Sequence, residues 1–186
     1  MIQNTPTTLP NLYLIGFMGT GKSSVGKFAS DKLGLKFLDS DQEIEKQNGC
    51  TISQIFESQG EEKFRALEKK FISAGHPESG CLVSCGGGLP VPKGMIELIK
   101  SKGIVFALWA KADTIFERTK ENTNRPLLQT ENPMAEINSL LKKRQNIYLL
   151  ANQVISSEMR STKQVADIVV RHYLNFCEEK KQNLTS

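Results

Sequence analysis

"LYLIGFMGTGKSSVGKFASDKLGL" (residues 12–35) joins an apolar run to a helical pattern through a cluster of glycines. LYLI has the composition of a buried strand, and apolar residues recur at helical spacing afterwards, among them Val25, Phe28 and Leu33. The glycines between these segments are followed by a lysine and two serines. Glycines spaced in this way leave bare backbone against which a ligand can lie. The stretch therefore predicts a strand, a ligand-binding loop and a helix in succession.

The loop itself, GFMGTGKS, matches the phosphate-binding pattern Gly-x-x-x-x-Gly-Lys-Ser from Gly16 to Ser23. In such a loop, backbone N–H groups turn inward around an anion, and the helix N-terminus adds partial positive charge. Lys22 then reaches the outer phosphates of a nucleoside triphosphate, and the Ser23 hydroxyl ligates Mg²⁺. The alternative is a Gly-rich turn without a ligand, which is disfavoured because both ends of the motif and both flanks fit.

Length and composition indicate one soluble globular domain of 186 residues, with 39% hydrophobic and 24% charged residues. The formal charge of +4 comes from lysines mixed with acids, which favours a small anionic ligand over nucleic acid. No apolar run approaches the ~20 residues of a membrane span, and the N-terminus does not resemble a signal peptide. We therefore expect a cytoplasmic protein with reduced cysteines and with neither nucleic acid nor membrane as a partner.

Short apolar runs alternate with helical patterns, which predicts an α/β fold with a mostly parallel sheet and helices on both faces. Strands are expected at Leu12–Ile15, Lys36–Leu38, Cys81–Ser84, Ile104–Trp109 and Gln153–Ile155. Helices are expected after Gly21, Asp41, Thr51, Gly60, Pro92, Lys111, Pro133 and Thr162. The polar stretch from Lys120 to Pro133 is typical of a mobile loop that covers a site.

Three missing features narrow the class of reaction. The chain has no guanine-reading Asn/Thr-Lys-x-Asp sequence, and the nearest match is AKAD at 110–113. The apolar strand CLVSCGGG ends in Ser84 and Cys85 rather than in a metal-binding aspartate. There is also no room for a separate motor arm. These absences favour a compact kinase for a small acceptor over a GTPase or a motor ATPase.

Asp39 and Asp41 lie two residues apart in FLDSD, at the end of the second predicted strand. If the strand continues that far, alternation places both side chains on one face. One carboxylate then helps to hold Mg²⁺ through water, and the other orients or deprotonates an attacking hydroxyl. For Asp41 alone, capping the next helix is an equally good interpretation. The pairing behind a phosphate-binding loop favours the functional one.

Two arginines are candidates for binding an acidic group. Arg65 lies at helical spacing from Glu61 and Glu68, which on spacing alone favours surface ion pairs over a ligand contact. Arg144 falls within an apolar helical stripe of residues 134–151, where a buried guanidinium requires an anionic partner. That partner is either a ligand or an acid or carbonyl group of the protein, and the sequence leaves both open.

Glycines 86–88 follow a predicted strand directly, at the edge where open parallel sheets bind ligands. Three in a row favour a close approach to a ligand over a merely flexible turn. RTKENTNRPLL places Arg118 before the polar loop and Arg125 inside it. A guanidinium carried in by a closing loop neutralises charge on a transferring phosphoryl group, whereas elsewhere two solvated arginines would be the default.

Together these segments resemble the shikimate kinase family over nearly the whole chain, from about Asn11 to Tyr173. The matching motifs are GFMGTGKS, FLDSD, GEEKFRALE, CGGG, RTKENTNRPLL and RQNIYLLA. The resemblance implies a P-loop NTPase fold of three α/β/α layers, with a five-stranded parallel sheet in the order 2-3-1-4-5. It also implies a single kinase domain over 1–186 with a core at about 11–173, frayed ends at 1–10 and 178–186, and a mobile lid at about 120–133.

The implied activity is transfer of the ATP γ-phosphate to the 3-hydroxyl of shikimate, giving shikimate 3-phosphate and ADP in aromatic amino-acid biosynthesis. The resemblance also implies Mg²⁺ as cofactor, ATP and shikimate as substrates, and a monomer. SSEMRSTKQV (residues 156–165) matches the family only loosely, so no adenine contact is carried over to Arg160 or Thr162.

The family's functional residues fall on positions of this chain that match its motifs. The resemblance implies a catalytic set of Lys22, Asp41 and Arg125. ATP binding would fall to Gly19, Thr20, Gly21, Lys22, Ser23, Ser24, Arg125 and, near adenine, Arg118. Ser23 and Asp39 would hold the metal, the latter through water. The acceptor site would comprise Asp41, the carboxylate clamp Arg65 and Arg144, Gly86, Gly87, Gly88, and the pocket walls Phe56 and Phe64.

Two other functions are weighed against this one. The first is a kinase for another hydroxylated compound, such as gluconate or a nucleoside monophosphate. An uncharged acceptor would not need two guanidinium groups. The second is a nucleotide-dependent binding or regulatory module that has lost the chemistry, against which the complete set of motif residues speaks.

Overall fold

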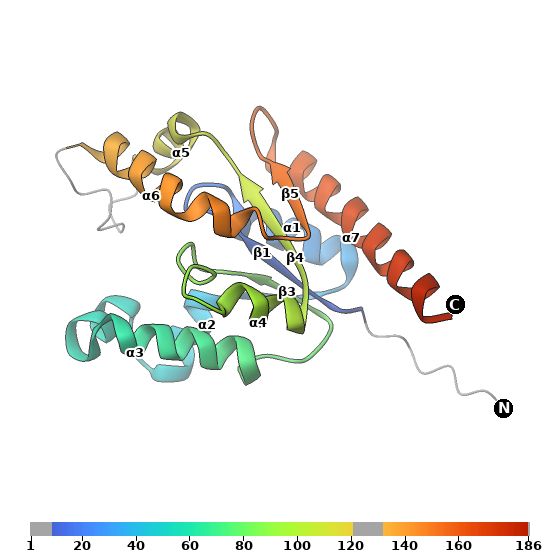
Figure 1. Ribbon diagram of the computed structural model, residues 1–186, viewed down its shortest axis with the longest axis horizontal. Helices are drawn as coiled ribbons and strands as arrows, with labels where there is room; N and C mark the ends of the chain where they lie inside the picture. Colours follow the sequence, from blue (N-terminus) through green and yellow to red (C-terminus); the bar gives the residue numbers. More distant parts are fainter. Residues whose placement is uncertain (1–8, 121–131, 186) are drawn as a thin grey trace.

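The computed structural model describes residues 9–120 and 132–185, without the side chains of 181 and 183–185. In this part of the chain a parallel sheet with strand order β2-β3-β1-β4-β5 carries helices on both faces (Figure 1). The strands are β1 (Asn11–Ile15), β2 (Lys36–Asp39), β3 (Cys81–Ser84), β4 (Gly103–Trp109) and β5 (Gln153–Ser156). The helices are α1 (Lys22–Leu33), α2 (Ser40–Asn48), α3 (Ile52–Ala74), α4 (Met95–Lys102), α5 (Ala112–Thr119), α6 (Pro133–Tyr148) and α7 (Thr162–Thr185). The predicted fold class and strand order are confirmed.

Residues of β1 alternate between two separate hydrophobic cores, one on each face of the sheet. Tyr13 and Ile15 pack into one core, and Leu12 and Leu14 pack into the other. All four are fully buried, because β1 is the central strand and has helices on both sides. A strand of this kind is continuously apolar, which is why LYLI shows no alternation in its sequence.

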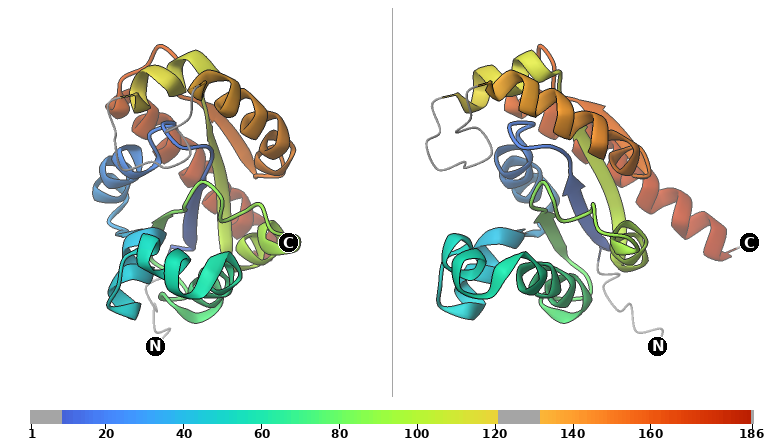
Figure 2. Two further views of the ribbon diagram at one scale, coloured as in Figure 1. Left: turned by 90° about the vertical axis from the view of Figure 1, so that its left-hand side faces the viewer. Right: turned by 60° about the vertical axis from the view of Figure 1, so that its left-hand side comes forward.

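Helices α1 and α7 cover one face of the sheet, and α3, α4 and α6 cover the other (Figures 1 and 2). Val25 and Ala29 of α1 meet Val165 and Val169 of α7 in one core. Helices α2 and α3 lie at one end of the molecule, and α5 and α6 lie at the other. The carboxyl edge of the sheet lies between these two ends (Figures 1 and 2).

The structure corrects several predicted boundaries. The helix expected after Asp41 begins at Ser40, and the helix expected after Pro92 begins at Met95. The two helices expected after Thr51 and Gly60 form one helix, α3, with a kink at Gly60 (φ 78°, ψ 174°).

Parts of both segments expected to fray belong to the described residues. The C-terminal residues from 178 onward continue α7 to Thr185. At the other end, Pro10 bridges to Ser79 and accepts a hydrogen bond from the Tyr173 hydroxyl. Residues 1–8 and most of the expected lid, 121–131, lie outside the described residues.

Because all strands are parallel, their carboxyl ends meet at one edge of the sheet. The register pairs Asp39 of β2 with Ser84 of β3, and Ser84 in turn with Leu14 of β1. The segments that follow β1, β2 and β3 therefore start side by side, although they are far apart in the chain. Among the helices of the described residues, none is long and apolar enough to cross a bilayer.

Candidate active site

The loop after β1 wraps the N-terminus of α1. Gly21, the N-cap residue of α1, has a φ of 93°, and no side chain caps the helix there. The first backbone N–H groups of α1 are therefore left for an anion. The Thr20 hydroxyl donates to the Phe17 carbonyl at 2.8 Å and holds the loop in shape.

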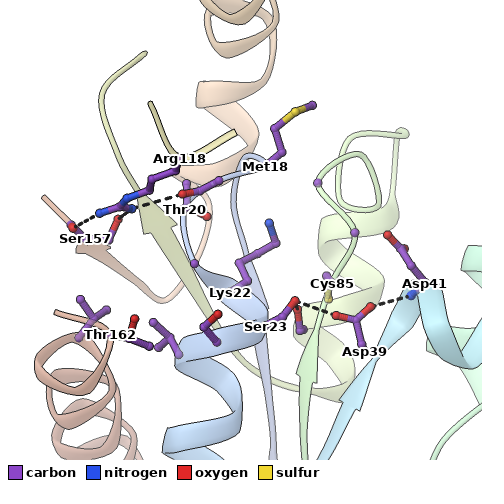
Figure 3. Close-up of a pocket in the computed structure, with 18 of the residues that line it drawn as sticks. Met18, Thr20, Lys22, Ser23, Asp39, Asp41, Cys85, Arg118, Ser157 and Thr162 are labelled. Atoms are coloured by element: carbon purple, nitrogen blue, oxygen red, sulfur yellow. Dashed lines mark hydrogen bonds between the residues drawn. The ribbon is translucent and has the colours of Figure 1, made fainter. Parts of the chain in front are cut away.

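Lys22 extends from the start of α1 into the open centre of the site (Figure 3). Its ammonium group donates to the Gly16 and Phe17 carbonyls, each at 2.9 Å, and the residue is only 9% exposed. A cation with so little contact with water is held at the position where phosphate oxygens would meet the loop.

Ser23, Asp39 and Ser84 form a group of oxygen atoms beside the loop. The Ser23 hydroxyl donates to Asp39 Oδ2 at 2.8 Å and lies 3.1 Å from Ser84 Oγ (Figure 3). Mg²⁺ prefers such hard oxygen ligands and takes few from the protein when phosphates and waters supply the others. No group of three or more His, Cys, Asp or Glu side chains suited to a metal occurs among the described residues. The oxygen set thus fits Mg²⁺ carried by a nucleotide.

The two aspartates do not share a strand face, because the strand does not continue as far as that prediction required. Strand β2 ends at Asp39, and Asp41 lies in the first turn of α2. Asp39 also caps this helix, because its side chain accepts the Asp41 N–H at 3.2 Å. The capping role considered for Asp41 thus belongs to Asp39, and Asp41 is left with its carboxylate turned toward the glycine loop.

Asp41 has a carboxyl group of raised pKa. Burial is the main cause, and the neighbouring Asp39 carboxylate adds to it, while the Ser40 hydroxyl and Lys22 act in the opposite direction. Ser40, which is fully buried, donates to Asp41 Oδ1 at 3.2 Å and accepts the Gly86 N–H at 2.8 Å. Sequence reasoning missed Ser40. The only available signal was its position between the two aspartates.

Gly86 and Gly88 approach candidate side chains closely, so a larger residue would clash at both positions. A Cβ atom at Gly86 would lie 2.5 Å from Asp41 Oδ1, and one at Gly88 would lie 3.1 Å from Arg65 Nη1. The Gly87 carbonyl accepts the Tyr148 hydroxyl at 2.8 Å. One loop therefore brings α2, α3 and α6 together.

Arg65 is held by two acids of its own helix. It donates to Glu61 Oε1 through Nε at 3.1 Å and Nη2 at 2.8 Å, and to Glu68 Oε2 through Nη1 at 2.8 Å. The ion pairs favoured by the spacing are confirmed. They do not form a simple surface ladder, because the Glu68 side chain is only 1% exposed. Burial raises the pKa of Glu68 to about 7, although Arg65 lowers it.

Arg144 lies partly buried on α6, with its guanidinium carbon 5.7 Å from the centre of the Phe17 ring. Ile137 and Tyr148, on the predicted apolar stripe, are buried as expected. Among the described residues Arg144 has no acid within ion-pair distance, in contrast to Arg65. The structural acid considered as its partner is thus absent from this part of the chain.

Phe56 and Phe64 pack against each other on α3, with ring centres 4.9 Å apart. Phe64 is buried and Phe56 is partly exposed, at 37%. The guanidinium carbon of Arg65 lies 5.5 Å from the centre of the Phe64 ring. This aromatic pair therefore continues the surface that carries Arg65.

Arg118 joins the phosphate loop to the segment after β5. Its guanidinium donates to the Gly19 carbonyl at 3.3 Å and to Ser157 Oγ and carbonyl at 3.0 and 2.9 Å (Figure 3). Arg125 lies outside the described residues, so its predicted role stays a prediction.

A cavity of about 690 Å³ opens along the phosphate loop. Its lining includes predicted residues from the loop, both aspartates, Gly86, Gly87 and Arg118. The lining residues that sequence reasoning did not assign are Met18, Val25, Ser84, Cys85, Ser157, Arg160, Ser161, Thr162 and Val165. The position of 157–165 after a parallel strand is the signal that pointed there. Arg65, Gly88, Arg144 and the two phenylalanines lie beyond this lining, joined to it by the glycine loop and Phe17.

The fold and cavity define a P-loop protein of the small-molecule kinase class. One side of the cavity is the phosphate-binding loop. The opposite side carries the Asp41 carboxylate, and Arg65 and Arg144 lie next to it. Residues 18–175 match the family model "Shikimate kinase". The chain belongs to the shikimate kinase family.

Individual relatives agree with the family match. A shikimate kinase of Thermodesulfovibrio yellowstonii is 42% identical over 165 residues, which is 89% of this chain and 95% of the relative. The shikimate kinase of Acinetobacter baumannii, solved in complex with shikimate, is 37% identical with a TM-score of 0.84, covering 90% of this chain and 94% of that one. The Aquifex aeolicus shikimate kinase structure is 33% identical with a TM-score of 0.75, and the match covers 89% of this chain and 96% of that one.

Proposed function

We propose that this protein transfers the γ-phosphate of ATP to the 3-hydroxyl of shikimate, giving shikimate 3-phosphate and ADP in aromatic amino-acid biosynthesis. One observation carries the proposal. Asp41 and Arg65 meet at the glycine loop 86–88, beside a phosphate-binding loop, and Arg144 lies against Phe17 of the latter. An acceptor with a hydroxyl and a carboxylate suits this arrangement, whereas an uncharged acceptor would leave the two arginines unused. Membership of the family supports the same substrate.

In this proposal the triphosphate of ATP lies along the loop, against the backbone N–H groups at the start of α1 and the Lys22 ammonium. Ser24 and the other loop residues carried over from the family line the same cavity. The adenine base of ATP lies at the end of the cavity away from Asp41, between Arg118 and residues 157–165. The bond from Arg118 to Ser157 supports this, because it fixes both walls of that end.

Ser23 and Asp39 would hold Mg²⁺, which neutralises phosphate charge when it is bound. Ser84 replaces the aspartate that often ends this strand in P-loop proteins, so Asp39 is the nearest carboxylate to the Ser23 hydroxyl among the described residues. Because Ser84 is neutral, Asp39 is the one acidic side chain hydrogen-bonded to Ser23 among the described residues, which suits a metal that arrives with its own phosphate ligands.

Asp41 orients the acceptor hydroxyl and accepts its proton. Its raised pKa makes it a better proton acceptor than an exposed aspartate. Arg65 and Arg144 bind the acceptor carboxylate, and Phe56 and Phe64 line the pocket around the ring of shikimate. Because the hydroxyl and the carboxylate are held at separate points, the acceptor is fixed in line with the γ-phosphate.

Arg125 on the lid at 120–133 would add positive charge to the transferring phosphoryl group. We also propose that residues 11–173 form the core of a single, monomeric kinase domain. The two hydrophobic cores on either face of one sheet support this organisation.

A coupled assay for ADP tests the proposal, with shikimate, gluconate and nucleoside monophosphates as acceptors. The expected result is ADP formation that depends on both Mg²⁺ and shikimate. Turnover with another acceptor and none with shikimate would overturn it. Nucleotide binding without turnover on any acceptor would instead favour a regulatory module.

A further inference from the structure

We propose that Glu61 occupies the edge of Arg65 that the acceptor carboxylate needs, and that the acceptor binds by displacing it. Glu61 thereby lowers the affinity for the acceptor and disfavours acceptors that cannot displace it from Arg65. The inference rests on the proposed function, because it assigns Arg65 to an acidic acceptor.

The geometry of the guanidinium carries the first step. A single oxygen, Glu61 Oε1, accepts from both Nε and Nη2, at 3.1 and 2.8 Å. These two donors form one edge of the planar group, the kind of edge that binds a carboxylate with two parallel hydrogen bonds. Glu68 uses only Nη1, on the other side of the group. The Nη1–Nη2 end of the group faces Gly88, where a Cβ atom would lie only 3.1 and 3.3 Å from the two nitrogens, so it leaves no room for a carboxylate. A carboxylate that binds Arg65 through two hydrogen bonds therefore takes the Nε–Nη2 edge and must replace Glu61.

The two acids differ in how firmly they are held. The Glu68 side chain is 1% exposed and the Glu61 side chain 65% exposed. An exposed ion pair contributes little because water and salt screen it, whereas loss of one partner of a buried pair is strongly destabilising. Glu68 is therefore a permanent anchor for Arg65, and Glu61 is an exchangeable partner.

The backbone around Glu61 also suits a side chain that leaves its partner. Glu61 directly follows Gly60, where α3 kinks, and no atom lies within 4 Å of the position of a Cβ there. It is thus the first residue of the helical segment after the kink. A released carboxylate stays near the positive end of that segment, which stabilises it.

Charge gives Glu61 its effect on selectivity. Glu61 and Glu68 both bind the Arg65 guanidinium. Asp41 is close enough for its negative charge to raise the pKa of Glu68. An anion approaching Arg65 meets net negative charge until Glu61 moves away. Arg144, which has no acid partner among the described residues, offers the first contact. An acceptor that reaches both arginines thus gains charged contacts with two guanidinium groups and loses one weak, exposed ion pair.

The test compares Glu61→Gln with Glu62→Gln, an exposed acid one residue further on in the same helix. Steady-state kinetics give KM for shikimate and for ATP, and calorimetry gives the shikimate Kd without turnover. For Glu61→Gln we expect KM and Kd for shikimate to fall about two- to five-fold, the range of an exposed ion pair. KM for ATP serves as the internal reference, and Glu62→Gln should behave as wild type.

An unchanged shikimate Kd in Glu61→Gln would overturn the inference. A raised Kd would do the same, because Glu61 would then position Arg65 rather than block it. Thermal unfolding of both variants checks that the fold is kept. These results are distinct from failure of the proposed function, which would appear as wild-type protein without shikimate-dependent ADP formation.

Discussion

The side of the cavity proposed for phosphate comes almost entirely from one short segment, residues 16–24, whereas the side proposed for the acceptor draws on α2, α3, α6 and the loop 86–88. The first side presents backbone N–H groups and one lysine. The second depends on carboxylates and guanidiniums that already interact with one another, such as Arg65 with Glu61 and Glu68.

This difference separates two ways of preparing a site. Backbone donors at a helix N-terminus have a fixed direction, and no side chain caps those at the start of α1. The side-chain charges of the other side, such as that of Arg65, already have partners, so their effect is sensitive to burial, ion pairing and pH. Substitutions on the phosphate side should therefore mainly lower kcat, and substitutions on the acceptor side should mostly change the affinity for the acceptor. The following variants test that division.

Lys22→Met should have the largest effect. It removes the buried cation of the phosphate loop, so we expect kcat to fall by about 10³-fold or more. Thermal unfolding should remain close to wild type, because the methylene chain can still pack. A variant that kept about a tenth of the wild-type kcat would refute the role of Lys22.

Asp41→Asn should lower kcat by about 10²–10³-fold while the ATP affinity stays near wild type. The amide keeps the shape of the side chain but cannot accept the proton. Nucleotide titration and single-turnover kinetics measure the two effects separately. A parallel loss of ATP affinity would place Asp41 on the nucleotide side and break the comparison.

Gly86→Ala should act through Asp41. The new methyl group would lie 2.5 Å from Asp41 Oδ1 and force it to move, and such misplacement lowers rates by about 10²-fold. Gly87→Ala is the matched control, since its methyl group meets nothing nearer than 3.4 Å. Equal losses in both variants would argue against a precise position for Asp41.

Arg144→Ala should raise KM for shikimate by about 10–100-fold, the cost of a lost charged hydrogen bond, with little change in KM for ATP. The fold should tolerate the change, because Arg144 has no acid partner among the described residues. Lys143→Ala, an exposed neighbour, is the control. A near-normal KM for shikimate in Arg144→Ala would contradict the proposed clamp.

The smallest effect concerns pH and Glu68. Its pKa is about 7 in the folded protein against an ordinary value of 4.5, so the folded state holds this proton more firmly than the unfolded state. Glu68 therefore favours folding at acidic pH, and this contribution is lost as pH rises from about 4.5 through about 7.

Glu68→Gln removes that dependence. Between pH 5 and pH 8, the variant should gain about 1–3 kcal/mol in unfolding free energy relative to wild type. Urea unfolding at both pH values gives the difference. Parallel changes in the two proteins would mean that Glu68 ionises normally.

The local sequence was sufficient wherever structure and function come from neighbouring residues. GFMGTGKS defined the loop, and LYLI and its counterparts defined strands whose bounds differ from the prediction by at most one residue at either end. The resemblance to a family supplied what local patterns did not, namely the strand order, which is confirmed, and the ligand proposed for Arg144.

Only the tertiary structure decided how the acidic residues are used. The pattern Asp-x-Asp suggested one strand face, but the chain turns into α2 at Ser40, which makes Asp39 the cap and leaves Asp41 at the glycine loop. Helical spacing on α3 likewise did not distinguish Glu61 from Glu68, because both positions allow an ion pair with Arg65. Burial separates them, and burial depends on which distant segments cover a helix face. The spacing of residues along a helix determines which way their side chains point. The strength of their electrostatic interactions depends on how far the fold shields them from water.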